Sequence, residues 1–214
     1  MEIAWLEVTD SPTSWSDVGF TVDGAGSCIV NGVEHRLVGA PADEGPRGIV
    51  RWGVRDIPGD VADIDGIPTV SVAEPGPATP APEAHPNGVF RIDHLVIRTS
   101  STPRTVAAIE ALGAGRRGGR NTNSAGEAVD MTFFWAGDTL LELAGPPVPV
   151  PDGPPARLAG LAFATEDLDG VAARLGGRLT TPVDAVQPGR RIAALTPAAG
   201  STVPVAFMTP HVRD

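Results

Sequence analysis

The stretch "FRIDHLVIRT", Phe90–Thr99, decides the fold, because it reads as a β-strand and carries a histidine near its centre. Successive side chains of a strand point to opposite faces. We therefore predict one face with Ile92, His94 and Val96, and an opposite face with Asp93, Leu95 and Ile97. A buried imidazole needs a hydrogen-bond partner, so the face that His94 occupies is the first question about function.

The segments after this strand occur twice in the same order. "TPRTVAAIEALG" predicts a helix, with apolar residues at helical spacing and a glycine at the stop, and "AVDMTFFWAG" and "DTLLELAGP" predict strands. Further along, "RLAGLAFATE" predicts a strand, "DLDGVAARLGG" a helix, and "RRIAALTP" and "TVPVAFMTP" two strands. Two βαβββ-like units in succession form an internal repeat and indicate an α+β fold.

Proline-rich breaks divide the chain. The clearest is "EPGPATPAPEAHPNG" (74–88), and a shorter one is "GPPVPVPDGPP" (145–155). We predict a β-rich module at 1–75, a Pro/Ala-rich linker at 76–88 with an exposed His85, and a domain of two units, 89–146 and 156–210, within 89–214. The first module has strand signals, a short helix at "SPTSWSDVGF" and a hairpin at Asn31-Gly32, and we interpret it as a degenerate copy of the same architecture.

Composition excludes several classes of function. A net charge of −10 disfavours nucleic acid and anionic membrane surfaces as partners. No apolar run approaches the roughly 20 residues that span a bilayer, and the N-terminal residues lack a signal-peptide pattern, so a cytoplasmic location is expected. The 16 basic residues are all arginine, which excludes a Schiff-base or P-loop lysine. "GAGRRG" (113–118) follows a helix, so we expect a loop there and no nucleotide cofactor.

At this point the sequence resembles the vicinal oxygen chelate superfamily, which groups glyoxalases, bleomycin-resistance proteins and extradiol dioxygenases. The resemblance rests on "IDHLVIRT", "LLELAGP", "GLAFATEDLDGVAARL" and "VPVAFMTP", and it covers roughly residues 89–210. "FFWAGDTLLELAGPP" is further similar to uncharacterised actinobacterial glyoxalase-like proteins. The resemblance implies paired βαβββ units in a curved open sheet, with a divalent metal on its concave face held by His and Glu from the first and last strands of each unit.

Carried over by position, the resemblance implies His94 and Glu142 as metal ligands in the first unit. The matching positions of the second unit are Gly160 and Ala206, which offer no ligating side chain. Strand alternation independently predicts Glu142 on the same face as His94, with Leu95 and Ile97 packed on the helix side. Three interpretations stay open: a divalent metal site completed by water, substrate or another group such as His211, Asp184 or Glu34-His35, a polar anchor in a ligand pocket, or a structural His–Glu pair.

Four other side chains are candidates for ligand binding. Arg190 or Arg191 enters a strand after a turn and could bind a carboxylate or phosphate, or pair with a nearby aspartate on the surface. Phe133 and Trp135 share a face and could floor an apolar pocket or simply belong to the core.

We therefore expect a glyoxalase-like protein that holds a small organic molecule in a concave cavity, with a degenerate metal site. The alternative is a divalent-metal-dependent lyase, isomerase or dioxygenase in which Glu142 serves as the catalytic residue. A third interpretation is a vestigial domain used for assembly, in which the N-terminal module covers the cavity or forms a homodimer.

Overall fold

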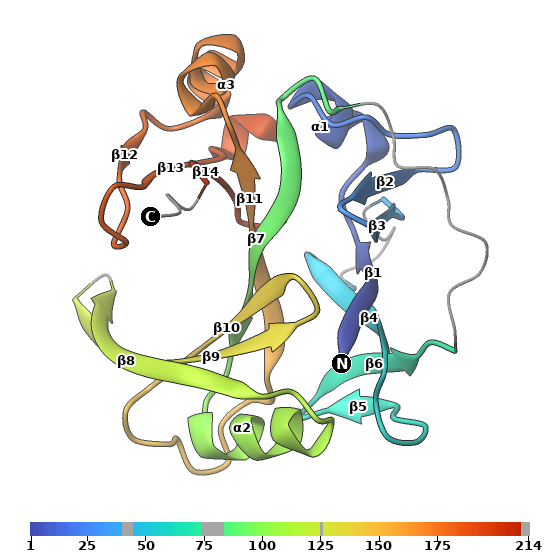
Figure 1. Cartoon of the computed structure of the whole chain (residues 1–214), viewed down its shortest axis with the longest axis vertical. Helices are drawn as coiled ribbons and strands as arrows, with labels where there is room; N and C mark the ends of the chain where they lie inside the picture. Colours follow the sequence, from blue (N-terminus) through green and yellow to red (C-terminus); the bar gives the residue numbers. More distant parts are fainter. Residues whose placement is uncertain (40–44, 74–83, 125, 211–214) are drawn as a thin grey trace.

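Two β-sheets form the molecule, each from one part of the chain. The computed structural model describes residues 1–39, 45–73, 84–124 and 126–210. Residues 1–71 contain a six-stranded sheet, and residues 89–208 contain an eight-stranded sheet (Figure 1). Most of the predicted linker, residues 76–83, lies outside the described residues. The described part holds no helix long and apolar enough to cross a membrane.

The eight-stranded sheet consists of two βαβββ units placed side by side. The first unit comprises β7 (Val89–Arg98), α2 (Thr102–Ala111), β8 (Arg116–Ser124), β9 (Glu127–Ala136) and β10 (Thr139–Gly145). The second comprises β11 (Arg157–Thr165), α3 (Leu168–Leu175), β12 (Val183–Asp184), β13 (Arg191–Ala194) and β14 (Val205–Met208). The strand order is β12-β13-β14-β11-β7-β10-β9-β8, so the first strands of the two units meet in the middle.

This arrangement confirms the predicted α+β fold class, with paired units in a curved open sheet. Strand β10 runs parallel to β7, β14 runs parallel to β11, and β7 and β11 are antiparallel. The sheet curls so that the outer strands of both units turn to the same side of β7 and β11 (Figure 1). That side is the concave face.

A local two-fold symmetry relates the central strands. Leu95 lies opposite Leu161, His94 opposite Ala162, and Val96 opposite Gly160. Exchanging the two strands about the Leu95–Leu161 pair therefore brings His94 onto Gly160. The register also shifts by one residue just outside each of these pairs, beside His94 on β7 and beside Gly160 on β11. Such β-bulges change which face the next side chain occupies.

The six-stranded sheet has the same strand directions with fewer elements. It comprises β1 (Glu2–Val8), α1 (Pro12–Asp17), β2 (Ser27–Val30), β3 (Val33–Leu37), β4 (Ile49–Arg55), β5 (Asp63–Ile64) and β6 (Ile67–Ser71). Its order is β2-β3-β1-β4-β6-β5. Strand β3 is parallel to β1, β6 is parallel to β4, and β1 and β4 are antiparallel in the centre, as β7 and β11 are.

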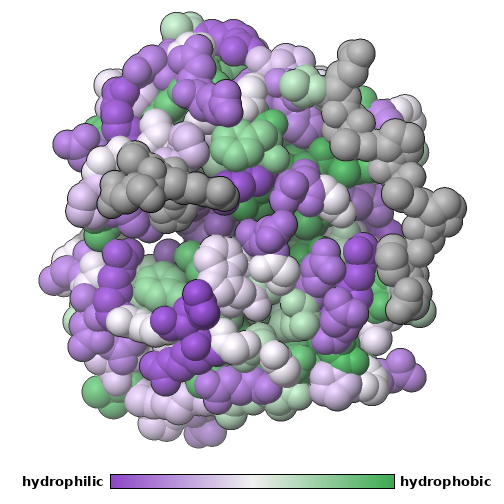
Figure 2. All heavy atoms as spheres, in the orientation of Figure 1, coloured by the Kyte–Doolittle hydropathy of each residue, from purple (hydrophilic) through white to green (hydrophobic). Residues whose placement is uncertain are grey.

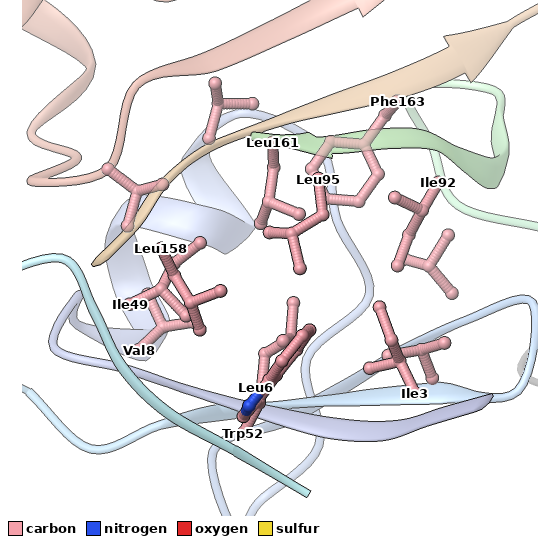
Figure 3. Packing of buried hydrophobic residues seen from close by; sticks show 14 of the residues in the cluster. Ile3, Leu6, Val8, Ile49, Trp52, Ile92, Leu95, Leu158, Leu161 and Phe163 are labelled. Atoms are coloured by element: carbon pink, nitrogen blue, oxygen red, sulfur yellow. The ribbon is translucent and has the colours of Figure 1, made fainter. Parts of the chain in front are cut away.

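The hydrophobic core lies between the two sheets. Figure 3 shows Leu6 and Trp52 of the smaller sheet directed toward Leu95, Leu161 and Phe163 of the larger one, and all five side chains are buried. Burial of each such side chain contributes roughly 1.5–3 kcal/mol. The back of β7 and β11 is thus fixed against the smaller sheet, which leaves their concave side for other uses.

Leu95 points toward the smaller sheet and belongs to a core cluster that also includes Ile109 of α2. Two expectations from the sequence were wrong at this level. Strand β8 occupies part of the stretch that we expected to be a loop. His85 is buried and not exposed. Its Nδ1 accepts from the Thr21 amide at 3.0 Å, and its Nε2 lies 3.0 Å from the Ile29 carbonyl oxygen.

Candidate ligand cavity

A cavity of about 380 Å³ lies on the concave side of the central strands, where the two units meet. This volume falls in the range of pockets that hold small organic molecules. The view in Figure 2 shows a notch in the molecular outline between the lobes of the two units. The lining residues are His94, Val96, Arg98, Arg157, Ala159, Gly160, Leu161, Ala162, Ala194, Leu195, Pro204, Val205 and Ala206.

His94 lies in the cavity wall and is oriented by its neighbour Asp93. The imidazole Nδ1 is 3.0 Å from Asp93 Oδ2. A carboxylate can only accept, so Nδ1 carries the proton and, in a neutral ring, Nε2 is left as an acceptor. The alternation predicted for this strand is wrong at Ile92 and Asp93: Ile92 is buried in the core with Leu95, and Asp93 contacts His94. The cause is the bulge between the pairs that His94 and Ile92 form with β11.

Asp93 is in turn held by Arg190. The guanidinium lies 2.5 Å from Asp93 Oδ1 and 3.2 Å from Oδ2, and it also donates to the Thr209 carbonyl oxygen at 2.7 Å. Both side chains are buried, Arg190 being only 2% exposed. Burial alone would raise the pKa of Asp93, but the hydrogen bonds from His94 and Arg190 outweigh it and hold that pKa well below its usual range. Asp93 therefore stays ionised and fixes the orientation of His94.

Arg190 and Arg191, the predicted ligand-binding arginines, do not line this cavity. Arg190 has the structural contact to Asp93 described above. Arg191 pairs with Asp169 on the surface, with 2.7 Å between Nη1 and Oδ2, and this contact raises the pKa of Arg191.

Glu142 belongs to the first unit but does not pair with His94. Glu142 lies opposite Val96 on β7. His94 is two residues before Val96 on that strand and lies opposite Leu140. Among the residues that the structure describes, no hydrogen bond or ion pair joins Glu142 to His94.

The second unit supplies no ligand at the equivalent positions. On β14, Ala206 lies opposite Ala162, as Glu142 lies opposite Val96 in the first unit. Gly160 corresponds to His94, and a Cβ on it would lie 2.9 Å from the Pro204 carbonyl oxygen.

In the described part of the chain, His94 and Glu142 do not form a metal site with three or more protein ligands. Metal sites of this kind take at least three side-chain ligands, and no three His, Cys, Asp or Glu side chains are grouped suitably in the described part of the chain. Asp184 is exposed on β12, Glu34 and His35 belong to the other sheet, and His211 lies outside the described residues.

Phe133 and Trp135 both lie on β9 of the first unit and are not among the residues that line the cavity. Phe133 is opposite Glu142 and packs with Val129, Met131 and Ala144 in a small satellite cluster. Trp135 is 39% exposed. Both remain candidate contacts for a ligand that extends beyond the cavity.

Arg98 and Arg157, which we did not select from the sequence, lie at one end of the cavity. They are the last residue of β7 and the first residue of β11, and they are directly opposite each other. Arg98 could have been found from its even spacing from His94. Arg157 required knowledge of the bulge at Ala159 and of how the two strands pair.

The equivalent place in the smaller sheet is filled by a side chain. Trp5 pairs with Gly53 next to a bulge, as His94 pairs with Ala162. A Cβ on Gly53 would overlap the Trp5 indole. The guanidinium of Arg36 covers that ring at 4.2 Å from its centroid.

The order and directions of the strands define a glyoxalase-like α+β fold. No protein-family model matches the chain, and no curated protein matches it in sequence. A solved methylmalonyl-CoA epimerase from Mycobacterium tuberculosis is 17% identical, with a TM-score of 0.46 over 58% of this chain and 91% of that one. A Streptomyces coelicolor methylmalonyl-CoA epimerase in complex with 2-nitronate-propionyl-CoA is 22% identical, with a TM-score of 0.44 over 58% of this chain and 99% of that one.

One likeness spans the whole chain. A fusion protein of a xylose isomerase-like TIM barrel and a 4-hydroxyphenylpyruvate dioxygenase has a TM-score of 0.63 at 10% identity, covering 100% of this chain and 50% of that one. This likeness shows the fold of both sheets together.

Proposed function

We propose that this protein is a glyoxalase-like member of the vicinal oxygen chelate superfamily that binds a small organic molecule in its concave cavity. The observation that supports this most is the cavity itself, about 380 Å³ in volume and placed where the two units meet. Its second-unit wall includes Ala162 and Ala206, whose short side chains leave space for a ligand.

His94 is the polar anchor in this proposal. Its Nδ1 is occupied by Asp93, which leaves Nε2 to accept a hydrogen bond from a hydroxyl or amide of the ligand. A pocket with an apolar wall and a few fixed polar groups selects its ligand by the positions of those groups.

A second candidate function is that of a divalent-metal-dependent lyase, isomerase or dioxygenase, with His94 and Glu142 as ligands and Glu142 as the catalytic residue. One observation favours it: the hydrogen bond from His94 to Asp93 is the arrangement usually found behind a metal-binding histidine. The donor set lacks two of the usual four positions, so we rank this candidate second.

The binding proposal can be tested by NMR on protein labelled at its alanine methyl groups. The methyls of Ala162 and Ala206 line the cavity, and Ala128 on the distant β8–β9 hairpin is a matched internal control. We expect members of a small-molecule library to shift the two cavity methyls and not Ala128, and His94→Ala to weaken ligands that carry a hydrogen-bond donor about tenfold. Shifts confined to sites outside the cavity would refute the proposal.

Elemental analysis separates the two candidates. About one divalent ion per chain in the wild type, lost in both His94→Ala and Glu142→Gln, would favour the metal-dependent enzyme. Metal retained equally by all three proteins would show that it binds elsewhere.

We further propose that residues 1–75 are a degenerate copy of the paired unit with a structural role. The strand directions, the bulge beside Trp5 and the filled position at Gly53 support this. In this proposal the smaller sheet covers the back of β7 and β11 and keeps the cavity wall rigid.

A further inference from the structure

We propose that Arg98 and Arg157 form an oxyanion site at one end of the cavity, so that the ligand is an organic anion carrying a carboxylate or phosphate group. This inference rests on the proposed binding function and names the chemical class of its ligand. The two arginines lie opposite each other where β7 ends and β11 begins, and both line the cavity.

The register explains why both guanidinium groups are on the concave side. Leu158 and Ile97, the neighbouring pair, are both buried in the core between the sheets. Side chains alternate along each strand, so the adjacent pair, Arg157 and Arg98, takes the opposite face. The bulge at Ala159 explains why Arg157 and Gly160, which are three residues apart and would otherwise lie on opposite faces, share the concave face.

The pair has no ion-pair partner in the described part of the molecule. Neither guanidinium forms an ion pair or a hydrogen bond with a described residue, and both side chains are exposed. Like charges directly opposite each other on neighbouring strands destabilise a sheet. The chain has 26 acidic residues against 16 arginines, so an unneutralised arginine pair is not a result of a shortage of carboxylates. An anion bound between the two would remove the repulsion.

Guanidinium groups suit this task because each presents a planar set of N–H donors that matches carboxylate and phosphate oxygens. The Cα atoms of Arg98 and His94 are separated by four residues of strand, or about 13 Å. We therefore expect a ligand with an anionic group at the arginine end, a small apolar body against Ala162 and Ala206, and a hydrogen-bond donor that reaches His94.

The test uses the full-length protein at low ionic strength and inorganic phosphate and acetate as probes. Binding is followed by NMR through the Nε–Hε signals of the arginines, which Arg98→Gln and Arg157→Gln assign. We expect both signals to shift together, and each substitution to weaken binding of the better probe about ten- to a hundredfold. Arg117→Gln, the same charge change at an exposed position on β8, should leave the affinity within about twofold.

A matched set then tests the ligand class: 3-hydroxybutyrate, 3-hydroxypropyl phosphate and the neutral 3-hydroxybutyramide. Preference for one of the two anions over the amide, lost in Arg98→Gln and Arg157→Gln, supports the inference and tells carboxylate from phosphate. If the amide shifts the Ala162 and Ala206 methyls as strongly as the anions do, the inference is overturned while the binding function stands. A typical site is saturated at about 1 mM of such a probe. If phosphate and acetate at up to about 50 times that concentration shift neither arginine signal, the oxyanion site is refuted, whatever the cavity binds.

Discussion

Acidification should destabilise this protein through His35, the histidine buried in the core. The ring is fully buried between Trp15 and Phe163, whose ring centroids lie 5.2 and 5.6 Å away. Its Nδ1 is 3.2 Å from the Cys28 carbonyl oxygen, and its Nε2 is buried without a hydrogen-bond partner among the described residues. Burial lowers the pKa of His35 from 6.5 to about 4. A proton on this ring would place a charge in an apolar core.

The sign and size of the effect follow from this pKa. The unfolded chain takes up a proton near pH 6.5 and the folded chain only near pH 4, so the contribution to stability is complete above pH 6.5 and is lost as the pH falls toward 4. Each pH unit between these values costs about 1.4 kcal/mol. From pH 7 to pH 4 the free energy of unfolding should therefore drop by about 3 kcal/mol through this residue alone.

Urea unfolding at pH 7 and at pH 4 measures this for the wild type and for His35→Leu, which keeps an apolar side chain in place. We expect the pH-dependent loss to be about 3 kcal/mol smaller in the variant. Burial also lowers the pKa of His85, and that contribution cancels in the comparison because both proteins carry it. Cys28→Ala is the matched control: burial raises the pKa of this thiol to about 12, so its effect on stability should not change between the two pH values. Equal pH dependence in wild type and His35→Leu would refute the reasoning.

Three further predictions concern single side chains. Gly53→Ala should lower the free energy of unfolding by about 1–3 kcal/mol because its Cβ overlaps the Trp5 indole, and Trp5→Leu should recover part of that loss in urea unfolding; an additive double variant would contradict this. Asp167→Ala should cost about 1 kcal/mol by thermal unfolding, because this carboxylate caps the first turn of α3; an unchanged melting temperature would show that the cap is dispensable. Gly160→His should destabilise the protein, because its Cβ would lie 2.9 Å from the Pro204 carbonyl oxygen, and dialysed protein should gain no bound metal by elemental analysis.

Much of the larger sheet was predictable from the sequence because its inner strands are buried on one face. The apolar alternation of β7 and β10 reflects the core directly, and β11 is a nearly continuous buried run of apolar and small residues. Strand β8 gave no such signal, since "RRGGRNTNS" is polar and glycine-rich. Its backbone hydrogen bonds to β9 at the sheet edge make it a strand.

The candidate site was predictable in part for a related reason. His94 could be recognised from its place in an apolar strand. Gly160 and Ala206, the second-unit positions that match His94 and Glu142 without a ligating side chain, followed from the resemblance. Asp93 was assigned to the wrong face because strict alternation has no means of representing a bulge. Arg98 and Arg157 become neighbours only because β7 pairs with β11, and the order of residues along the chain does not predict that register.

The central strands β7 and β11 have two faces with separate tasks, and this has a consequence for how the protein can change. Leu95 and Leu161 belong to the core between the two sheets, while His94 and Gly160, one residue before each of them, line the cavity. Under the proposed binding function, a cavity-side substitution whose volume fits would alter the choice of ligand without loosening the core. One scaffold can in this way carry different binding specificities, with ligand recognition and folding stability under separate selection at alternate positions of the same strand.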